Sequence, residues 1–328
     1  MIYEKASDVV LDDVFLRLPG FLSAGEVFLK LEGLNPAGSV KLKTAVALVE
    51  SMERDGTLRP GSPVIESSSG NLGVALSVVC AAKGYPLTVV TDPNASRHSL
   101  RVMRSLSTEV VEVTTRDAQG GFLNTRITYI HRRLAEDPTL VWLNQYANPA
   151  GVRAHRDRTA ASVHKGLGTV DALFVGAGTT GTLMGCVEYF AEHSPGTRVV
   201  AVDAVGSVTF GGPAAPRFIP GLGTSRRPEL FTDGGGFEKL LVAEPDTVAM
   251  CRRVAETYGL LVGGSTGTVL AAVQQLAPTL APGSRVAVIS PDMGDKYIDT
   301  VYSDAWVAER YTGIPELAGL GPTATSSR

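Results

Sequence analysis

Short apolar segments alternate with longer segments of mixed polarity along most of the chain. A first run of this alternation extends from residues 43–56 to residues 140–144, and a second extends from residues 172–176 to residues 285–290. Short apolar strands that alternate with helices are typical of parallel sheets covered on both faces. The pattern therefore predicts an α/β fold of two lobes, each with a mainly parallel sheet, and a cleft between them.

The spacing of apolar residues assigns the elements within the two runs. For example, Ala45, Leu48, Val49 and Met52 share one helical face. The expected helices lie at residues 43–56, 71–84, 96–106, 122–136, 180–193, 246–259 and 268–276. The expected strands lie at residues 62–66, 86–91, 109–113, 140–144, 172–176, 198–203 and 285–290.

Two segments fall outside the alternation. Residues 204–235 are rich in Gly and Pro and are long for a loop, and loops of this length are often functional. We expect the polar tail at residues 316–328 to be disordered. No fixed-period repeat is present in the sequence.

Composition narrows the class of protein. The chain has 328 residues, of which 44% are hydrophobic and 19% charged, as in a compact enzyme of about two domains. A net charge of −3 and the lack of a basic stretch with interleaved aromatics predict that nucleic acid is not a partner. No apolar run approaches the roughly 20 residues of a membrane span. The N-terminus lacks a signal-peptide pattern, so we expect a cytoplasmic protein whose three cysteines are buried free thiols.

A glycine-rich turn follows the apolar run at residues 172–175. It spells G-x-G-x-x-G through Gly176, Gly178 and Gly181, and Asp203 closes the next apolar run. On the residues alone, this is the pattern of a dinucleotide-binding loop with its ribose-binding acid. The start of a helix with glycine amides also binds a phosphate monoester, so the motif leaves the ligand open.

Two other chemistries are disfavoured by the sequence. Ser265 lies in GGSTG, a possible hydrolase elbow, but no histidine follows it, as an α/β-hydrolase would need. No two histidines are spaced i, i+4 and no CxxC occurs, so we predict no protein-bound metal.

Two further motifs carry candidate chemistry. Lys41 follows NPAGSV just before a helix, where a lysine can have a lowered pKa that suits Schiff-base formation; it could also be a surface lysine. Residues 66–76 read ESSSGNLGVAL, which could grip a carboxylate with hydroxyls and backbone N–H groups, or simply cap the helix.

Taken together, these motifs resemble those of the fold-type-II pyridoxal-phosphate (PLP) enzymes, the cysteine synthase and cystathionine β-synthase family. The match covers residues 10–310, and NPAGSVK, SSSGNLG, GTTGT, GGSTG and VISPDMGDKY occur in family order. The resemblance implies a tryptophan synthase β-like fold of two three-layer αβα lobes with the active site between them. It also implies PLP-dependent β-replacement through an aminoacrylate, in which PLP is the electron sink.

The resemblance also assigns roles to particular residues. It implies that Lys41 forms the Schiff base, that Asn71 reaches the ring hydroxyl of PLP, and that Ser265 faces the pyridine nitrogen. The cofactor phosphate is assigned to Gly178, Thr179, Thr180, Gly181 and Thr182. The expected substrate-binding residues are Ser67, Ser68, Ser69, Gly70, Arg126, Gln145, Tyr146 and Gly221.

Several stretches depart from cysteine synthase and resemble a narrower branch, the N-(2-amino-2-carboxyethyl)-L-glutamate synthases. These stretches include GGFLNTRITYI with Arg126, NQYANPAG with Tyr146, and PRFIPGLGTSRRPEL with Gly221. The branch implies O-phospho-L-serine and L-glutamate as substrates and a product that supplies 2,3-diaminopropionate for a siderophore or peptide antibiotic. Cysteine synthase with sulfide, and a non-catalytic PLP- or partner-binding protein, stay open as alternatives.

The family also implies an organisation for the whole chain. We expect a smaller, mobile domain at residues 36–147 and a larger PLP-binding domain made of residues 1–35 and 148–315. A homodimer is the expected assembly. We expect small-molecule partners only, with neither nucleic acid nor membrane among them.

Overall fold

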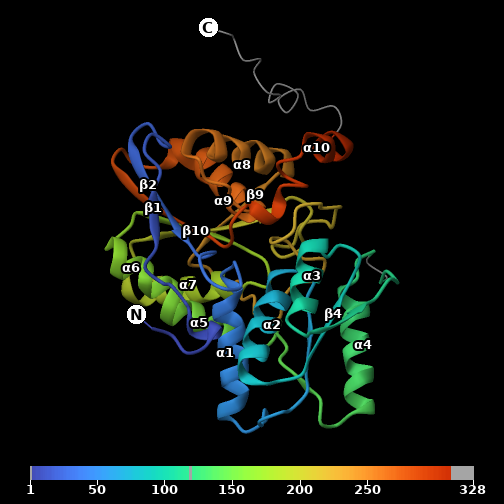
Figure 1. Cartoon of the computed structure of the whole chain (residues 1–328). Coiled ribbons are helices and arrows are strands. Elements are labelled where there is room, and N and C mark those ends of the chain that lie inside the picture. The colour runs from blue at the N-terminus through green and yellow to red at the C-terminus, as the bar shows by residue number, and fades with distance from the viewer. Residues whose placement is uncertain (1, 118–119, 312–328) are drawn as a thin grey trace.

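The computed structural model describes residues 2–117 and 120–311 as a two-lobed α/β protein (Figure 1). Each lobe contains one sheet, and helices cover the sheets on both sides. The predicted fold class is confirmed. The tail predicted at residues 316–328 lies outside the described residues.

The larger lobe contains a six-stranded sheet of order β1-β2-β10-β7-β8-β9. Its pairs are parallel except that β1 runs antiparallel to β2. The strands are β1 Phe15–Arg17, β2 Gly25–Leu31, β7 Ala172–Gly176, β8 Arg198–Ala204, β9 Glu238–Val242 and β10 Ser284–Ser290. The helical segments are α5 Ala150–Ala154, the π-helical η2 His155–Ala160, α6 Ala161–Leu167, α7 Gly181–His193, α8 Glu244–Tyr258, α9 Gly264–Leu276, η3 Ala277–Thr279, η4 Asp295–Tyr297 and α10 Asp304–Arg310.

The smaller lobe contains a four-stranded parallel sheet of order β5-β4-β3-β6. Its strands are β3 Val64–Ser67, β4 Leu87–Thr91, β5 Glu109–Glu112 and β6 Val141–Trp142. Its helices are α1 Lys41–Arg54, α2 Asn71–Lys83, α3 Arg97–Ser105 and α4 Leu123–Glu136, and a short η1 Ala6–Asp8 precedes them in the chain. All these strands and the four α-helices fall within residues 36–147, although the domain boundaries themselves stay a prediction.

Local sequence signals explain where several helices start and stop. Ser96 caps α3 by accepting a hydrogen bond from the Ser99 N–H. Gly84 and Gly259 end α2 and α8 in the left-handed conformation, which glycine adopts without steric cost. The helices expected at residues 246–259 and 268–276 begin earlier than predicted, at Glu244 and Gly264.

Separate apolar cores lie beneath the elements of the two lobes. The largest packs α8 and α9 against the larger sheet, and a second packs α1 and α2 against the smaller sheet. Cys80, Cys186 and Cys251 are buried free thiols, as predicted, and burial raises the pKa of each to about 12. Within the described part of the chain, no helix is both long and apolar enough to span a bilayer.

A charged cluster lies buried beside α1. The Lys43 ammonium on α1 contacts Glu32 at 2.8 Å and Asp12 at 2.6 Å, and it donates to the Thr159 hydroxyl of η2 at 3.3 Å. Lys30 on β2 pairs with the same Glu32 at 3.4 Å. These ion pairs therefore connect α1 of the smaller lobe to the carboxyl end of β2 in the larger sheet.

One prediction concerns the close packing of α7 on η2. A Cβ at Gly185 would lie 2.6 Å from both the Arg156 nitrogen and the Val152 oxygen, which are backbone atoms. We expect Gly185→Ala to lower the free energy of unfolding by about 1–3 kcal/mol, because the two segments must move apart. Urea unfolding measures this effect. Gly196→Ala is the matched control, since a Cβ there meets no atom within 4 Å; equal losses in both variants would contradict the packing argument.

Candidate active site

Two groups of the predicted site residues lie where parallel strands end and helices begin. In the smaller lobe, β3 ends at Ser67 and α2 begins at Asn71. In the larger lobe, β7 ends at Gly176 and α7 begins at Gly181. Because the carboxyl ends of parallel strands meet at one edge of a sheet, each lobe presents its loops at one edge.

Lys41 is the first residue of α1 and is held by the loop that follows β10. The Val40 N–H donates to the Pro291 carbonyl at 2.7 Å, and Ser39 forms an antiparallel bridge with Asp292. Burial lowers the pKa of the Lys41 amine to about 8, while the Asp292 carboxylate acts in the opposite direction. An amine with this pKa is partly neutral near physiological pH, as nucleophilic chemistry requires.

The glycine-rich turn before α7 has the features of an anion site. Thr180 precedes the helix in the left-handed conformation, with φ of 69°, and no side chain caps the first turn. The Thr180 hydroxyl is buried and has no hydrogen-bond partner within the described residues. Thr179 is half-buried, and Gly181 and Thr182 are buried. Uncapped N–H groups at a helix start, together with a buried unpaired hydroxyl, fit a phosphate.

Gly221 brings the predicted phosphate turn and Ser265 together. Its φ of +111° is a conformation that favours glycine, and a Cβ there would lie 3.4 Å from the Ser265 Cβ. A Cβ at Gly178 would lie 2.9 Å from the Gly221 carbonyl oxygen. Ser265 is buried in the first turn of α9. The 204–235 segment thus lies against two of the predicted site residues through Gly221.

The hydroxyls of Ser67 and Ser68 in the serine-rich loop make different contacts. The Ser68 hydroxyl accepts hydrogen bonds from the Gly73 N–H at 2.9 Å and the Gly70 N–H at 3.3 Å, so Ser68 caps α2. Ser67 instead faces the segment after β6: its hydroxyl lies 3.4 Å from the Tyr146 hydroxyl, and its carbonyl accepts from Gln145 Nε2 at 2.7 Å. Ser69 and Gly70 are half-buried.

Arg126 is buried on α4 and contacts Asp92 through its Nε at 3.3 Å. It is therefore not an exposed helix arginine. Burial raises the pKa of the Tyr146 hydroxyl and of the Glu66 carboxyl, while the charge of Arg126 acts on both in the opposite direction. The charge of Arg126 therefore favours the ionised forms of both groups.

Four residues that the sequence did not single out complete the site. Glu66 is fully buried, and its carboxylate accepts hydrogen bonds from Ser67, Gln145 and Trp142. Asp292, Lys296 and Tyr297 form a network around Asn71. Asp292, Lys296 and Tyr297 belong to the motif VISPDMGDKY, but the position of this motif in the chain did not indicate that they would lie around Asn71.

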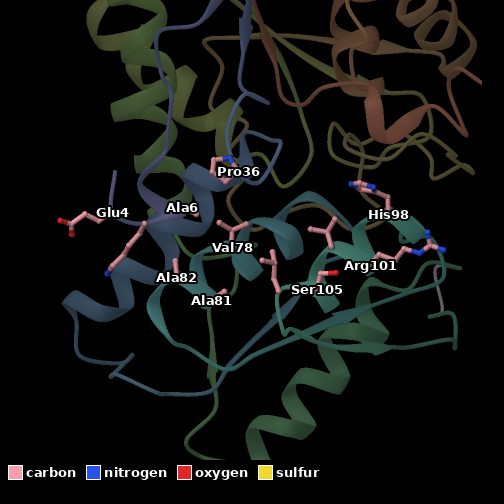
Figure 2. Close-up of a pocket in the computed structure, with 12 residues that line it drawn as sticks. Glu4, Ala6, Pro36, Val78, Ala81, Ala82, His98, Arg101 and Ser105 are labelled. Carbon is pink, nitrogen blue, oxygen red and sulfur yellow. The ribbon is translucent and has the colours of Figure 1, made fainter. Parts of the chain in front are cut away.

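A separate groove of about 710 Å³ lies on the outside of the smaller lobe along α2 and α3 (Figure 2). Residues Glu4 to Ala6 border it on one side, and His98 and Arg101 of α3 on the other. None of the predicted site residues lines this groove. Within residues 2–117 and 120–311, no group of three or more His, Cys, Asp or Glu residues could hold a metal ion.

The residues at the cleft fit a phosphorylated aldehyde cofactor. A desolvated lysine suits the aldehyde, an uncapped helix start with a buried unpaired hydroxyl suits the phosphate, and a buried serine at the start of α9 lies against Gly221. The fold and site therefore define an α/β enzyme of the PLP-dependent class.

Comparison with known proteins identifies the family. The family described as "Pyridoxal-phosphate dependent enzyme" matches residues 15–292, and the chain belongs to it. The chain is 42% identical over 269 residues to an N-(2-amino-2-carboxyethyl)-L-glutamate synthase of Ralstonia nicotianae, covering 82% of this chain and 80% of the relative. It is 42% identical over 292 residues to a synthase of the same name from Cupriavidus metallidurans, covering 87% and 85%.

A solved structure agrees with this family. The crystal structure of an O-ureido-L-serine synthase superimposes with a TM-score of 0.84 at 28% identity, covering 94% of this chain and all of that one. The chain is thus a PLP-dependent, transferase-type enzyme of β-replacement, and PLP is its cofactor.

The buried carboxyl of Glu66 generates a prediction about pH. Burial raises its pKa to about 7 from an ordinary value of 4.5, despite three hydrogen bonds and the nearby Arg126. Between these values the folded chain keeps a proton that the unfolded chain loses, so this contribution to stability falls as pH rises. We expect Glu66→Gln to remove up to roughly 3 kcal/mol of this pH dependence.

Urea unfolding of the apoprotein at several pH values from 4.5 to 7 measures the effect. Glu112→Gln is the control, because Glu112 is exposed at the end of β5. A pH profile of Glu66→Gln that parallels the parent protein would show that Glu66 does not bind the proton.

Proposed function

We propose that this enzyme joins O-phospho-L-serine and L-glutamate to give N-(2-amino-2-carboxyethyl)-L-glutamate and phosphate. The observation that carries the proposal is the guanidinium of Arg126 on α4, which is buried and lies 3.3 Å from its ion-pair partner, Asp92. The names of the two relatives at 42% identity support the same reaction. A phosphate leaving group carries close to two negative charges near neutral pH, so a site that accepts it benefits from a fixed cation.

Lys41 has two roles in this proposal. PLP, when bound, supplies the electron sink for β-elimination and replacement. Lys41 would be its attachment point, and the free Lys41 amine would be the base that takes the proton from the substrate Cα. The lowered pKa of about 8 suits both roles, because the free amine must be neutral to attack or to accept a proton.

Other residues hold the cofactor and substrate. Residues 178–182 bind the cofactor phosphate through the start of α7, Ser265 faces the pyridine nitrogen, and Asn71 faces the ring hydroxyl. A hydroxyl opposite the pyridine nitrogen does not enforce its protonation as a carboxylate would, which favours elimination over transamination. The serine-rich loop at residues 67–70 binds the substrate carboxylate, with Ser68 acting mainly through the N–H groups that it orders at the start of α2.

Arg126 and its neighbours discriminate between leaving groups and nucleophiles. The Arg126 Nε lies 3.3 Å from Asp92 without a hydrogen bond to it, and the edge formed by the two terminal nitrogens of the guanidinium carries further N–H donors. We assign that edge to the phosphate of O-phosphoserine. Gln145 and Tyr146, held by Ser67, help to place the incoming glutamate, and Gly221 closes the site over Ser265.

The cellular setting is also part of the proposal. The enzyme works in the cytoplasm as a homodimer, and its product supplies 2,3-diaminopropionate for a siderophore or peptide antibiotic. The resemblance to the family supports these statements, and the relatives' name supports the product of the reaction.

Lys41→Ala should abolish the visible absorbance of the bound cofactor and lower the β-replacement rate by at least about a thousandfold. The substitution removes both the attachment point of the cofactor and the proposed base. Borohydride reduction of the parent holoenzyme followed by peptide mass spectrometry should place the label on Lys41. Lys165→Ala is the control, since Lys165 is exposed on α6. A label on another lysine would overturn the assignment.

Arg126→Ala should reduce kcat/KM for O-phosphoserine about ten- to a hundredfold, with O-acetylserine nearly unchanged, because one charge-assisted contact is lost. Arg126→Lys should retain part of the preference. Steady-state kinetics with both donors and with glutamate or sulfide as acceptor test this prediction. Arg132→Ala on the exposed face of α4 is the matched control.

Two results would count against the proposal. If both donors lose rate equally in Arg126→Ala, the arginine has a structural role. If the parent enzyme prefers O-acetylserine and sulfide, the protein is a cysteine synthase.

A further inference from the structure

The carboxamide of Asn71 is held from both sides by residues of the other lobe. Its Nδ2 donates to Asp292 Oδ2 at 2.7 Å, and Lys296 Nζ donates to its Oδ1 at 2.6 Å. The two contacts assign the faces of the amide: the oxygen meets a cation and the nitrogen meets a carboxylate. Rotating the amide by 180° would place N–H groups against the ammonium, so only one orientation is compatible with both neighbours.

Asp292 is the centre of this network. Besides the amide of Asn71, its Oδ2 accepts the Tyr297 hydroxyl at 2.7 Å and pairs with Lys296 at 3.0 Å. The side chain is 1% exposed. Charge-assisted hydrogen bonds in a buried setting are stronger than neutral ones, so this carboxylate is a firm anchor for Asn71.

The surrounding backbone prevents Asp292 from shifting. Its carbonyl accepts the Gly263 N–H at 3.2 Å, and its backbone bridges to Ser39, two residues before Lys41. A Cβ at Gly263 would lie 1.8 Å from Asp292 Oδ1, so only glycine leaves room for the carboxylate. Asp292 therefore joins the segments that carry Lys41, Asn71 and Ser265, the residues assigned to the cofactor.

We propose that Asp292 and Lys296 are positioning residues that fix the orientation of the Asn71 carboxamide across the two lobes and thereby set how tightly the chain binds its cofactor. The inference rests on the proposed contact between Asn71 and the ring hydroxyl. It is independent of whether the donor is O-phosphoserine or O-acetylserine.

Binding of a cofactor analogue to the apoprotein tests the proposal without reference to activity. The probe is 4′-deoxypyridoxine 5′-phosphate, which has the ring hydroxyl and phosphate of PLP but no aldehyde to react with Lys41. Isothermal titration calorimetry gives its Kd for the parent, Asn71→Ala, Asp292→Asn and the double variant. Asp295→Asn is the matched control, because Asp295 is exposed and lies one residue before Lys296.

We expect Asn71→Ala and Asp292→Asn each to raise the Kd by roughly tenfold or more, as the loss of one charge-assisted contact would. If Asp292 acts through Asn71, the double variant should bind within about threefold of Asn71→Ala, because the second substitution then removes nothing further. The control should bind like the parent. The melting temperature of each apoprotein verifies that the fold is intact.

The double variant distinguishes positioning through Asn71 from a direct effect of Asp292 on the cofactor. A Kd that rises by the same factor for Asp292→Asn in both backgrounds would overturn the proposal, since Asp292 would then act without Asn71. An unchanged Kd in Asn71→Ala would overturn it together with the assignment of Asn71 to the cofactor. If Asp292→Asn does not fold, Lys296→Met replaces it in the same cycle, because Lys296 contacts the amide from its other side.

Discussion

The parallel pairing of strands determines where every part of the candidate site lies. Parallel strands end at one edge of their sheet, so the segments that follow β3, β7 and β10 all leave from the carboxyl edges. Helices α2 and α7 begin there, where the helix dipole favours anions; no side chain caps the first turn of α7, whereas Ser68 accepts the Gly73 N–H of α2. The two anionic groups of the proposed chemistry, a substrate carboxylate and a cofactor phosphate, are matched to these two helix starts.

A second constraint is the attachment of α1, which carries Lys41, to the edge of the larger sheet. The attachment is the buried contact of Lys43 with Glu32 and Asp12. Buried charges are costly unless they are paired, and removal of one partner commonly costs about 3–5 kcal/mol. Because Lys43 lies only two residues after Lys41, the ion pairs restrict how far the amine can move relative to the larger lobe.

The sequence predicted the elements with regular apolar patterns and missed those without them. Strand β2 was not predicted because Lys30 interrupts its apolar residues. Lys30 is buried there and forms an ion pair with Glu32 in place of apolar packing. Strand β9 was not predicted because most of its residues are not buried. The segments α5, η2 and α6 were not predicted because charged residues such as Arg156 and Arg158 interrupt the helical pattern. These elements depend on tertiary contacts, and a local sequence pattern does not reveal such contacts.

The candidate-site residues were likewise predicted where their sequence signal is local and missed where it is not. Short motifs indicated Lys41, Gly178 and Ser265 as candidates, because each lies within a few residues of a helix start and its signal in the sequence is local. Asp292 and Lys296 could not be found by this route, since their partner Asn71 lies more than two hundred residues earlier in the chain. Only the folded structure brings the two lobes together and shows the contact.

Asp203 shows how the structure distinguishes two uses of one motif. In a dinucleotide-binding loop the acid after the second strand would bind a ribose, but here Asp203 is fully buried and its carboxylate accepts the Ala204 N–H at 2.7 Å. Burial raises its pKa, and the hydroxyls of Ser207 and Thr209 oppose the rise by hydrogen bonding to it.

The same hydroxyls connect Asp203 to the cofactor side of the fold. The Ser207 hydroxyl accepts the Thr224 N–H at 3.1 Å, and the adjacent Gly223 N–H donates to the Ala177 carbonyl in the glycine-rich turn at 3.0 Å. Asp203 thus supports the loop that carries Gly221 against Gly178 and Ser265. An acid that binds a ligand in one fold here supports the loop that lies against the proposed phosphate site.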